Sequence, residues 1–326
     1  MDFSLTESQQ AIADLAGQLL DEAKPAGSGQ QESTGPWKEL ARAGLLSLSL
    51  PAELGGDGLG VLETAALLTE VGRRAAPVPA LATLMTGVLP IVRWGDGGLR
   101  RVLLPPAAAG ELILTAAIRE PSDPMPAIPA ATVTDGTVSG TKVGVPYCAQ
   151  AGRVLVPVSF EDTTGVVIID PAAPGAHVTR TPAAGPEYTL RLDRVPVEHV
   201  LGEAAALNDL YQLAVAGACC LADGALSAAL ALTRDHVAAR RQFGKPLATF
   251  QAVAQQIADV YITSRTLHLV TQSACWRLDA GEDAAGDVGV AGYWCAQEAP
   301  PSVRKCHHLH GGTGMDTPIP CTTSPR

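Results

Sequence analysis

The sequence predicts an α+β protein in which an N-terminal helical domain, a central antiparallel β-domain and a C-terminal helical bundle follow one another. Three changes of pattern indicate this order. Apolar residues first recur at helical spacing, short β-branched runs broken by Gly, Pro and Asp begin near Leu112, and a long helical period returns after Asn208. We therefore place the domains at residues 1–110, 111–205 and 206–326.

The N-terminal domain opens with an amphipathic segment. We expect Thr6 to cap this helix, with Glu7 in its first turn. The apolar residues that should face the core are Leu5, Ile12, Leu15, Leu19 and Leu20. A Gly/Ser-rich gap at 26–35 precedes a second helix at about 37–43. "PAELGGDGLG" (51–60) reads as a loop between helices, because its spacing is not GxGxxG and no strand precedes it.

The central domain has the alternating runs typical of strands, such as "ATVTDGTVSGTKVGV" and "GVVIID". Asp135–Gly136 lies between two alternating segments, a position and pair of residues that predict a two-residue hairpin turn. The pattern ends near His199. We therefore expect an antiparallel sheet built from short strands.

The C-terminal domain contains three long helical segments. The first spans about 210–240, which at 1.5 Å per residue is on the order of 45 Å long. Thr249 should cap the second, at 250–279, and the third, at 288–310, should be kinked at Pro300–Pro301. Long helices joined by short connections form a bundle.

Composition narrows the class of protein. Acidic residues outnumber basic ones by 33 to 23, which argues against a nucleic-acid-binding protein, because phosphates are neutralised by a basic surface. The N-terminus lacks the charged and apolar regions of a signal peptide. We also find no apolar run of about 18 residues or more. These features predict a cytoplasmic protein without a membrane span.

The cysteines and histidines suggest neither a disulfide framework nor a metal centre. Seven cysteines are an odd number, and none has CxxC spacing. The one metal-like cluster consists of Cys306, His307, His308 and His310. A structural zinc site needs four ligands in closed geometry, and no second cluster supplies the remainder. We expect ordinary histidines at a helix end and no metal.

Three motifs, found in this order, resemble the acyl-CoA dehydrogenase family. "ARRQFGKPLATFQAV" (239–253) is similar to the family's Arg-x-x-Phe-Gly…Phe/His-Gln motif, and "HHLHGGTGMD" (307–316) to its Leu-His-Gly-Gly-x-Gly turn. "PAELGGDGLG" is similar to its Pro-Glu-x-x-Gly-Gly loop. The likeness covers essentially the whole chain. It implies the acyl-CoA dehydrogenase fold, FAD as cofactor and α,β-dehydrogenation of a CoA thioester.

The resemblance implies a flavin site shared at a subunit interface. In the family the motif arginine, here Arg240, meets the flavin pyrophosphate of a neighbouring subunit, and a planar guanidinium with five donors suits a diphosphate. Taken alone, each motif favours a simpler interpretation, a solvated helix end at Arg240–Arg241 or a helix stop at Gly311–Gly312. Found together, the two motifs favour cofactor binding. The expected cofactor-binding residues are Arg240, Gln242, Phe243, Leu247, Phe250, Gln251, His308, Leu309, Gly311 and Gly312.

The glutamate that removes the substrate's α-proton in this family has no counterpart at the matching positions. One family position lies roughly two dozen residues beyond the Gly-Gly turn, past the last residue given, and the other lies near the start of the first bundle helix. There the sequence reads "YQLAVAGACC" (211–220), and Ala214 falls closest to the expected point. Asp209 and Glu203 are the nearest acids, and neither sits at the matching position. We identify no catalytic base.

The segments that would line the flavin ring and the thioester also depart from the family pattern. "REPSDPMPAIPA" (119–130) retains Glu120–Pro121 of a Thr-Glu-Pro-x-x-Gly-Ser-Asp stretch but lacks the Gly-Ser-Asp. "KVGVPYCAQAG" (142–152) lacks the tryptophan of a Trp-(Ile/Val)-(Thr/Ser) stretch. The half of the flavin site that serves a neighbour, at 240–251 and 309–312, is intact.

This combination resembles the non-catalytic subunit of actinobacterial α2β2 acyl-CoA dehydrogenases of steroid and cholesterol side-chain catabolism. It implies a homologous partner subunit that bears the catalytic glutamate, an acyl-CoA substrate that is a steroid side-chain CoA ester, and an electron-transfer acceptor. Two alternatives remain. In the first, the chain is a self-sufficient dehydrogenase with Asp209 or Glu203 as a displaced base. In the second, it is a catalytically dead scaffold that binds CoA esters or proteins.

The polar tail "TPIPCTTSPR" has no helical period, which suggests a truncation or frame error after about Asp316 and missing last helices.

Overall fold

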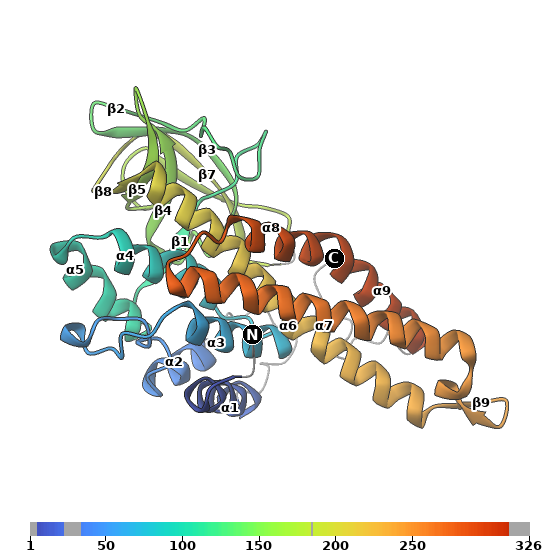
Figure 1. The fold of residues 1–326 in the computed structure, drawn as a ribbon. Helices are drawn as coiled ribbons and strands as arrows, with labels where there is room; N and C mark the ends of the chain where they lie inside the picture. The colour runs from blue at the N-terminus through green and yellow to red at the C-terminus, as the bar shows by residue number, and fades with distance from the viewer. Residues whose placement is uncertain (1–4, 23–33, 184, 313–326) are drawn as a thin grey trace. The chain divides into compact units, whose positions relative to one another are not determined.

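The computed structural model describes residues 5–22, 34–183 and 185–312 (Figure 1). The chain divides into two compact units. Unit 1 comprises Met1–Lys24, Ala65–Pro77 and Val215–Arg326, and unit 2 comprises Pro25–Thr64 and Val78–Ala214. The division into three domains at residues 110 and 205 stays a prediction. The tail "TPIPCTTSPR" and most of the Gly/Ser-rich gap lie outside the described residues.

The N-terminal helices begin as the sequence predicts. Thr6 caps the first helix, because its hydroxyl accepts the backbone N–H of Gln9 at 3.3 Å while the Gln9 side chain accepts the N–H of Thr6 at 3.0 Å. Leu15 was expected in the core but is 39% exposed, and Ala16 is buried instead. The helices are α1 (Glu7–Glu22), α2 (Thr34–Arg42), α3 (Val61–Arg73), α4 (Leu89–Trp94) and α5 (Gly97–Ala108), with a 3₁₀ turn at Ala52–Leu54 and a π-helical segment at Leu81–Val88.

The segment 51–60 is the loop that its spacing predicted. Gly55 and Gly58 have φ of 80° and 65°, in the left-handed region that favours glycine. A Cβ on Gly56 would lie 2.3 Å from the carbonyl oxygen of Leu50. The glycines of this loop therefore serve its tight path into α3.

The central sheet is mixed rather than antiparallel. Its strands run in the order β6-β7-β3-β2-β4-β5-β8, and β1 pairs with β4 in parallel, as does β2 at a single bridge. The predicted hairpin at Asp135–Gly136 is confirmed: φ is positive at both residues, 49° and 70°. The strands are β1 (Ile113–Ala116), β2 (Thr132–Thr134), β3 (Thr137–Pro146), β4 (Ala151–Ser159), β5 (Thr164–Ile169), β6 (Ala176–Arg180), β7 (Glu187–Pro196) and β8 (His199–Glu203).

The C-terminal helices are long, as expected, but two details differ. Phe250 rather than Thr249 is the N-cap of α7, and the Thr249 hydroxyl donates to the carbonyl of Pro246 at 2.7 Å. The third segment is interrupted by a π-helical turn at Trp294–Glu298, ahead of the prolines, which occupy the first turn of the following helix. The helices are α6 (Ala204–Ala239), α7 (Gln251–Ala280), α8 (Ala285–Tyr293) and α9 (Ala299–His310).

Of the described helices, α6 alone is long and apolar enough to cross a bilayer, with an 18-residue window of mean hydropathy 1.8. The expectation that no such run exists was wrong, because a single acid, Asp223, hardly lowers the mean. However, 44% of this window is buried within the protein. The side chain of Asp223 is itself buried and contacts His268 of α7 at 2.9 Å. These are the features of the core helix of a bundle.

Within unit 1, α3 and α6 cross with their backbones in contact. A Cβ on Gly224 of α6 would lie 1.9 Å from the carbonyl oxygen of Thr69, and one on Gly72 of α3 would lie 2.1 Å from that of Leu221. Backbone atoms cannot move aside as a flexible side chain can. Two glycines therefore set the closeness of this crossing.

Replacing Gly224 with alanine is expected to lower the free energy of unfolding by about 2 kcal/mol, because the methyl group must push α3 away. Urea unfolding followed by circular dichroism measures the change. Gly286 of α8 is the matched control, since a Cβ there meets no atom within 4 Å. Gly286→Ala should stay within about 1 kcal/mol of wild type. Equal stability of the two variants would contradict the crossing.

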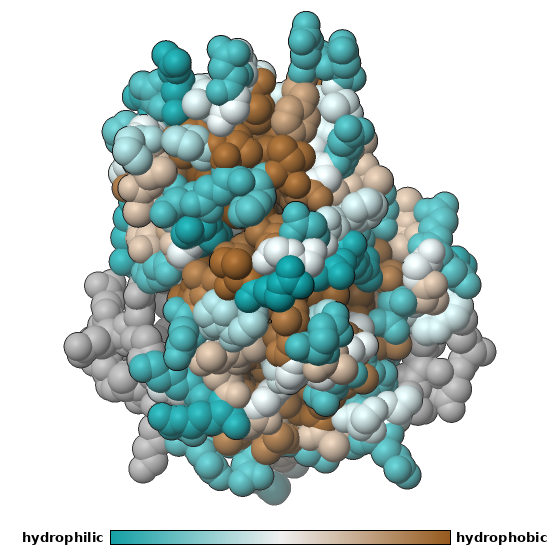
Figure 2. Space-filling model, turned by 90° about the vertical axis from the view of Figure 1, so that its left-hand side faces the viewer, coloured by the Kyte–Doolittle hydropathy of each residue, from teal (hydrophilic) through white to brown (hydrophobic). Residues whose placement is uncertain are grey.

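Large apolar side chains reach the surface of both units. On one face, hydrophobic surface is interrupted by hydrophilic residues (Figure 2). Several exposed side chains belong to two helices of the bundle, α7 and α8. They are Tyr261, Ile262, Leu269, Val290 and Tyr293. Such side chains are typical of surfaces that contact another protein.

Candidate functional site

The candidate site begins where α6 ends. The N–H of Arg240 makes the last helical hydrogen bond, to the carbonyl of His236 at 2.8 Å, and its carbonyl accepts the N–H of Leu247 at 2.8 Å. The chain between them is a hairpin of β9 (Arg241–Gln242) and β10 (Lys245–Pro246), which joins α6 to α7 (Figure 1). These bonds fix Arg240 at the base of the hairpin.

The other side of the site is the end of α9. Gly311 ends this helix with φ 59° and ψ −141°, a conformation that favours glycine. Among the described residues, no heavy atom lies within 4 Å of a Cβ built on Gly311 or Gly312. The sequence "HGG" therefore stops the helix, and its glycines add no side chain beside the final turn.

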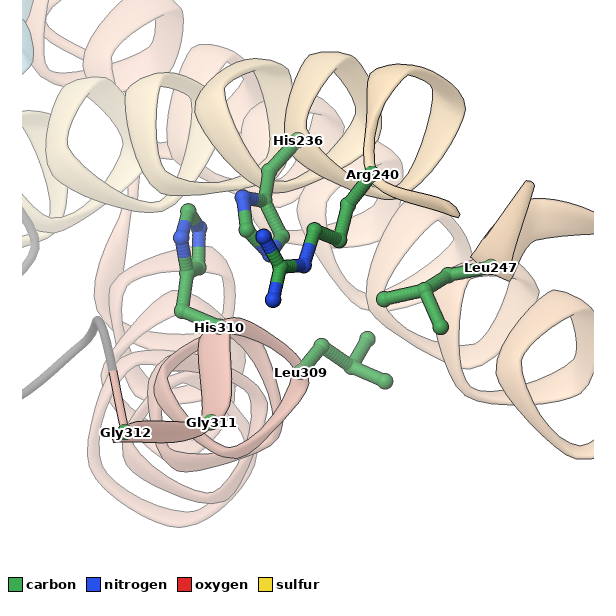
Figure 3. Close-up of a pocket in the computed structure, with 7 residues that line it drawn as sticks. All are labelled: His236, Arg240, Leu247, Leu309, His310, Gly311 and Gly312. Atoms are coloured by element: carbon green, nitrogen blue, oxygen red, sulfur yellow. The ribbon is translucent and has the colours of Figure 1, made fainter. Parts of the chain in front are cut away.

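These two ends face each other across a pocket of about 430 Å³. Arg240 bends back along α6 toward the imidazole rings of His236 and His310, while Leu247 and Leu309 point toward each other (Figure 3). The lining residues are His236, Arg240, Leu247, Leu309, His310, Gly311 and Gly312. The pocket thus combines a permanent cation, two imidazoles, apolar walls and glycine backbone.

The two imidazoles stack. Their ring centroids are 4.4 Å apart with an interplanar angle of 25°, and Nε2 of His310 lies 3.3 Å from the Thr233 hydroxyl. Burial of His310, together with the nearby His236 and His307, lowers the pKa of His310 below its ordinary value of 6.5. His310 therefore holds less positive charge at neutral pH than an exposed histidine would.

The structure brings together half of the expected cofactor-binding residues. Arg240, Leu247, Leu309, Gly311 and Gly312 line the pocket. The sequence analysis missed His236 and His310. The spacing of His236 and Arg240, one helical turn apart, is the signal that could have found the first. His310 precedes the two glycines directly, which is the signal for the second.

The other expected residues lie elsewhere. Phe243, at the hairpin tip with φ 50°, is 92% exposed, and its ring meets Phe250 edge-on at 6.3 Å. Lys245 Nζ lies 4.5 Å from the centre of the Phe250 ring. The residues Gln242, Gln251 and His308 are exposed and do not line the pocket. Their role toward a cofactor stays a prediction.

The weak base candidates are not poised for proton abstraction. Asp209 accepts hydrogen bonds from the Arg93 guanidinium and from the Trp94 indole N–H, the latter at 2.8 Å. Glu203 is exposed at the end of β8, where it pairs in register with Gly165. Ala214 is half-buried and has no ionisable group. Asp209 therefore acts as the acceptor of a structural hydrogen-bond network.

A buried ion pair holds the segment 119–130 in place. The Glu120 carboxylate accepts a hydrogen bond from Nζ of Lys142 at 2.7 Å, and it accepts two more from the N–H groups of Ala130 and Ala131 at 2.8 and 3.1 Å. Burial alone would raise the pKa of Glu120, but these hydrogen bonds together hold it below its ordinary value. The Tyr211 hydroxyl donates to the carbonyl of Pro126 at 2.9 Å. The carboxylate retained from the family motif is thus bound within the fold.

The thiols form no disulfide among the described cysteines. Cys220 and Cys275 are buried with their sulfurs 3.6 Å apart, and both are free. Hydrogen bonding to Cys275 and burial raise the pKa of Cys220 well above its usual value, so this thiol is unreactive. In the part of the chain that the structure describes, no three His, Cys, Asp or Glu side chains group as a metal site. Cys321 lies outside the described residues.

Comparisons with known proteins agree with this fold and these motifs. The acyl-CoA dehydrogenase N-terminal domain matches residues 6–111, and the acyl-CoA dehydrogenase C-terminal domain matches residues 208–323. The chain is 44% identical to acyl-CoA dehydrogenase FadE28 of Mycobacterium tuberculosis, over 98% of this chain and 91% of the relative. It is 31% identical to FadE27 of the same organism, over 98% and 91%.

Solved structures extend the likeness to three dimensions. The ChsE4–ChsE5 complex from Mycobacterium tuberculosis is matched with a TM-score of 0.92 at 30% identity, over 99% of this chain and 91% of the matched chain. A variant of the Tcur3481–Tcur3483 steroid ACAD is matched with a TM-score of 0.88 at 34% identity, over 97% and 90%. With its helical, mixed-sheet and helical segments and its Arg-x-x-Phe-Gly and His-Gly-Gly motifs, the chain belongs to the acyl-CoA dehydrogenase family of oxidoreductases.

Proposed function

We propose that this chain is the non-catalytic subunit of a heteromeric, FAD-dependent acyl-CoA dehydrogenase whose homologous partner subunit bears the catalytic glutamate. The observation that supports this most is the state of the candidate bases: Ala214 stands at the expected position, and Asp209 is bound to Arg93 and Trp94. A general base must be free to accept the substrate's proton.

The pocket fits the diphosphate part of FAD. A guanidinium and imidazole N–H groups are donors for phosphate oxygens, and the open backbone at Gly311 and Gly312 permits close approach. FAD, when bound, supplies the acceptor for the hydride that leaves the substrate's β-carbon. In our proposal Arg240 holds the diphosphate, Leu247 and Leu309 exclude water, and the partner's glutamate takes the α-proton.

The steroid side-chain CoA ester is the proposed substrate. Of the two solved structures described above, one is the ChsE4–ChsE5 complex and the other is a variant of the Tcur3481–Tcur3483 steroid ACAD. The exposed apolar side chains of α7 and α8 supply a surface on which a homologous subunit can pack. An electron-transfer acceptor completes the proposed set of partners.

Co-expression with a glutamate-bearing homologue tests the proposal. The chain alone, the pair, and the pair with the partner's glutamate changed to glutamine are assayed with a steroid side-chain CoA ester and with butyryl-CoA. We expect turnover only in the unmodified pair, and only with the steroid ester. Turnover by the lone chain, or by the pair that lacks the partner's carboxylate, would sink the proposal.

Two substitutions separate this proposal from a displaced base. Asp209→Asn and Glu203→Gln should each leave kcat of the active pair within about threefold, because neither group abstracts the proton. A general base would contribute at least about a hundredfold. Because Asp209 also binds Arg93, the thermal midpoint of that variant is measured alongside, so that unfolding is not mistaken for lost catalysis. A selective drop in kcat for a folded variant would identify the base.

A further inference from the structure

The pocket contains two side chains that can gain or lose a proton, His236 and His310, beside the guanidinium of Arg240. His236 lies in the last turn of α6, Arg240 directly follows that helix, and His310 approaches from the end of α9 (Figure 3). The stacked rings of His236 and His310 are close enough that a proton on one disfavours a proton on the other. An anion placed beside both rings would remove that penalty.

We propose that the stacked His236–His310 pair is a proton-coupled anion receptor, which takes up a proton when the diphosphate of a dinucleotide binds beside Arg240. The inference rests on the proposed function for the identity of the dinucleotide, FAD, but not for its chemistry. Arg240 supplies a charge that does not change with pH. His310 adds a charge that a bound anion would favour.

The Thr233 hydroxyl fixes the orientation of the His310 ring. It lies 3.3 Å from Nε2 of His310 and donates to the carbonyl of Ala229 at 2.7 Å, so its oxygen can accept a proton from the ring. A protonated His310 would therefore keep Nε2–H bonded to Thr233. The added charge of the ring would then act on a phosphate held beside Arg240. His236, less buried than His310, would share that phosphate.

The other charged groups near the pair do not account for such a response. Arg234 and Asp235 of α6 pair with each other at 2.9 Å, and Lys305 of α9 pairs with Asp259 of α7 at 2.9 Å. Lys245 of the hairpin lies over Phe250. The remaining titratable groups in the last turn of α9 are His307 and His308. Of these two, His307 contributes to the lowered pKa of His310, and it serves as a third variant in the test.

The sign of the effect follows from linkage. In the free chain the lowered pKa of His310 keeps it largely neutral at pH 7. Binding of a diphosphate favours the charged form and raises the pKa, so a proton is taken up on binding. Affinity must then rise as pH falls, with a limit of about tenfold per pH unit for each proton. Because the pKa of His310 in the free chain lies below 6.5, the rise should lie between about pH 7.5 and pH 5.5.

ADP-ribose is a suitable probe, because both of its phosphates are diesters and lack the second ionisation near pH 6 that a phosphate monoester has. Calorimetry with the full chain at pH 5.5, 6.5 and 7.5 should show an affinity about five- to tenfold higher at pH 5.5 than at pH 7.5. His310→Gln and His236→Gln should flatten this dependence while Arg240 still supports weak binding. His307→Gln should change it less, and His177→Gln, at an exposed position of β6, should leave it unchanged.

Imidazole NMR of the wild-type chain provides a readout that does not depend on how the variants fold. With isotopically labelled histidine, saturation by ADP-ribose should raise the pKa of His310 by about one unit, a tenfold change in proton affinity. An affinity that is flat from pH 7.5 to pH 5.5, no binding of ADP-ribose, or an unchanged His310 titration would each overturn the inference. A pair without FAD but with proton-coupled ADP-ribose binding would overturn only the proposed function.

Discussion

Replacing Lys142 with methionine is expected to destabilise the protein by about 3–5 kcal/mol, because the charge of Glu120 would stay buried without its partner. The Lys142 side chain is 0% exposed and that of Glu120 is 2% exposed. Urea unfolding monitored by circular dichroism measures the loss. Glu120→Gln should cost a similar amount, since it leaves the ammonium unpaired.

The exposed pair Lys305–Asp259 is the matched control, with side chains 39% and 50% exposed. Lys305→Met should change the free energy of unfolding by less than about 1 kcal/mol. A loss for Lys142→Met no larger than this control would contradict the role of the buried pair.

The buried pair also predicts a response to acid. Because the folded-state pKa of Glu120 lies below its ordinary value of 4.5, the stability that it contributes is complete above that value and is lost as the pH falls below it. Wild type should therefore lose more stability between about pH 5 and pH 3 than Glu120→Gln does. Parallel losses in the two proteins would show that other carboxylates determine the acid response.

Replacing Arg240 with glutamine is expected to weaken FAD binding by the assembled pair roughly 10- to 100-fold. A charge-assisted hydrogen bond contributes about 1.5–3 kcal/mol, and each 1.4 kcal/mol is a factor of ten. The affinity of Arg240→Lys for FAD should fall between those of Arg240→Gln and wild type, since an ammonium keeps the charge but not the bidentate geometry of a guanidinium. The dissociation constant is measured by diluting the complex and recording the fluorescence of the flavin that is released.

Arg234 is the control for Arg240, because it lies near the end of α6, pairs with Asp235 and does not line the pocket. Arg234→Gln should bind FAD as wild type does. If both variants lose flavin equally, the effect is one of general surface charge. If neither does, the guanidinium of Arg240 is not at the diphosphate.

Local patterns allowed most elements to be predicted, because they depend on neighbouring residues. The cap at Thr6, the turn at Asp135–Gly136 and the long helices after residue 204 follow from short-range chemistry. The parallel pairing of β1 with β4 could not be predicted, since strand direction is set by tertiary packing and not by alternation. The π-helical turn at Trp294–Glu298 likewise has no local signal comparable to a proline.

The candidate site was half predictable for the same reason. Arg240 and Gly311–Gly312 stand in motifs, whereas the stacking of His236 on His310 joins two helices that are distant in sequence. The pairing of Glu120 with Lys142 also needed the sheet to bring the two side chains together. Residue identity alone therefore indicated a remnant of a motif that would line the flavin ring and the thioester, whereas the fold holds Glu120 in a buried ion pair.

The flavin content of the purified pair tests the central claim most directly. The visible absorbance of the flavin, divided by the protein concentration and combined with the mass of the assembly, gives FAD per subunit. Our account predicts one FAD per pair and a colourless lone chain, because each bound flavin needs Arg240 and its pocket from this chain and the ring pocket and glutamate from the partner. One FAD on every subunit, with equal affinity, would contradict it.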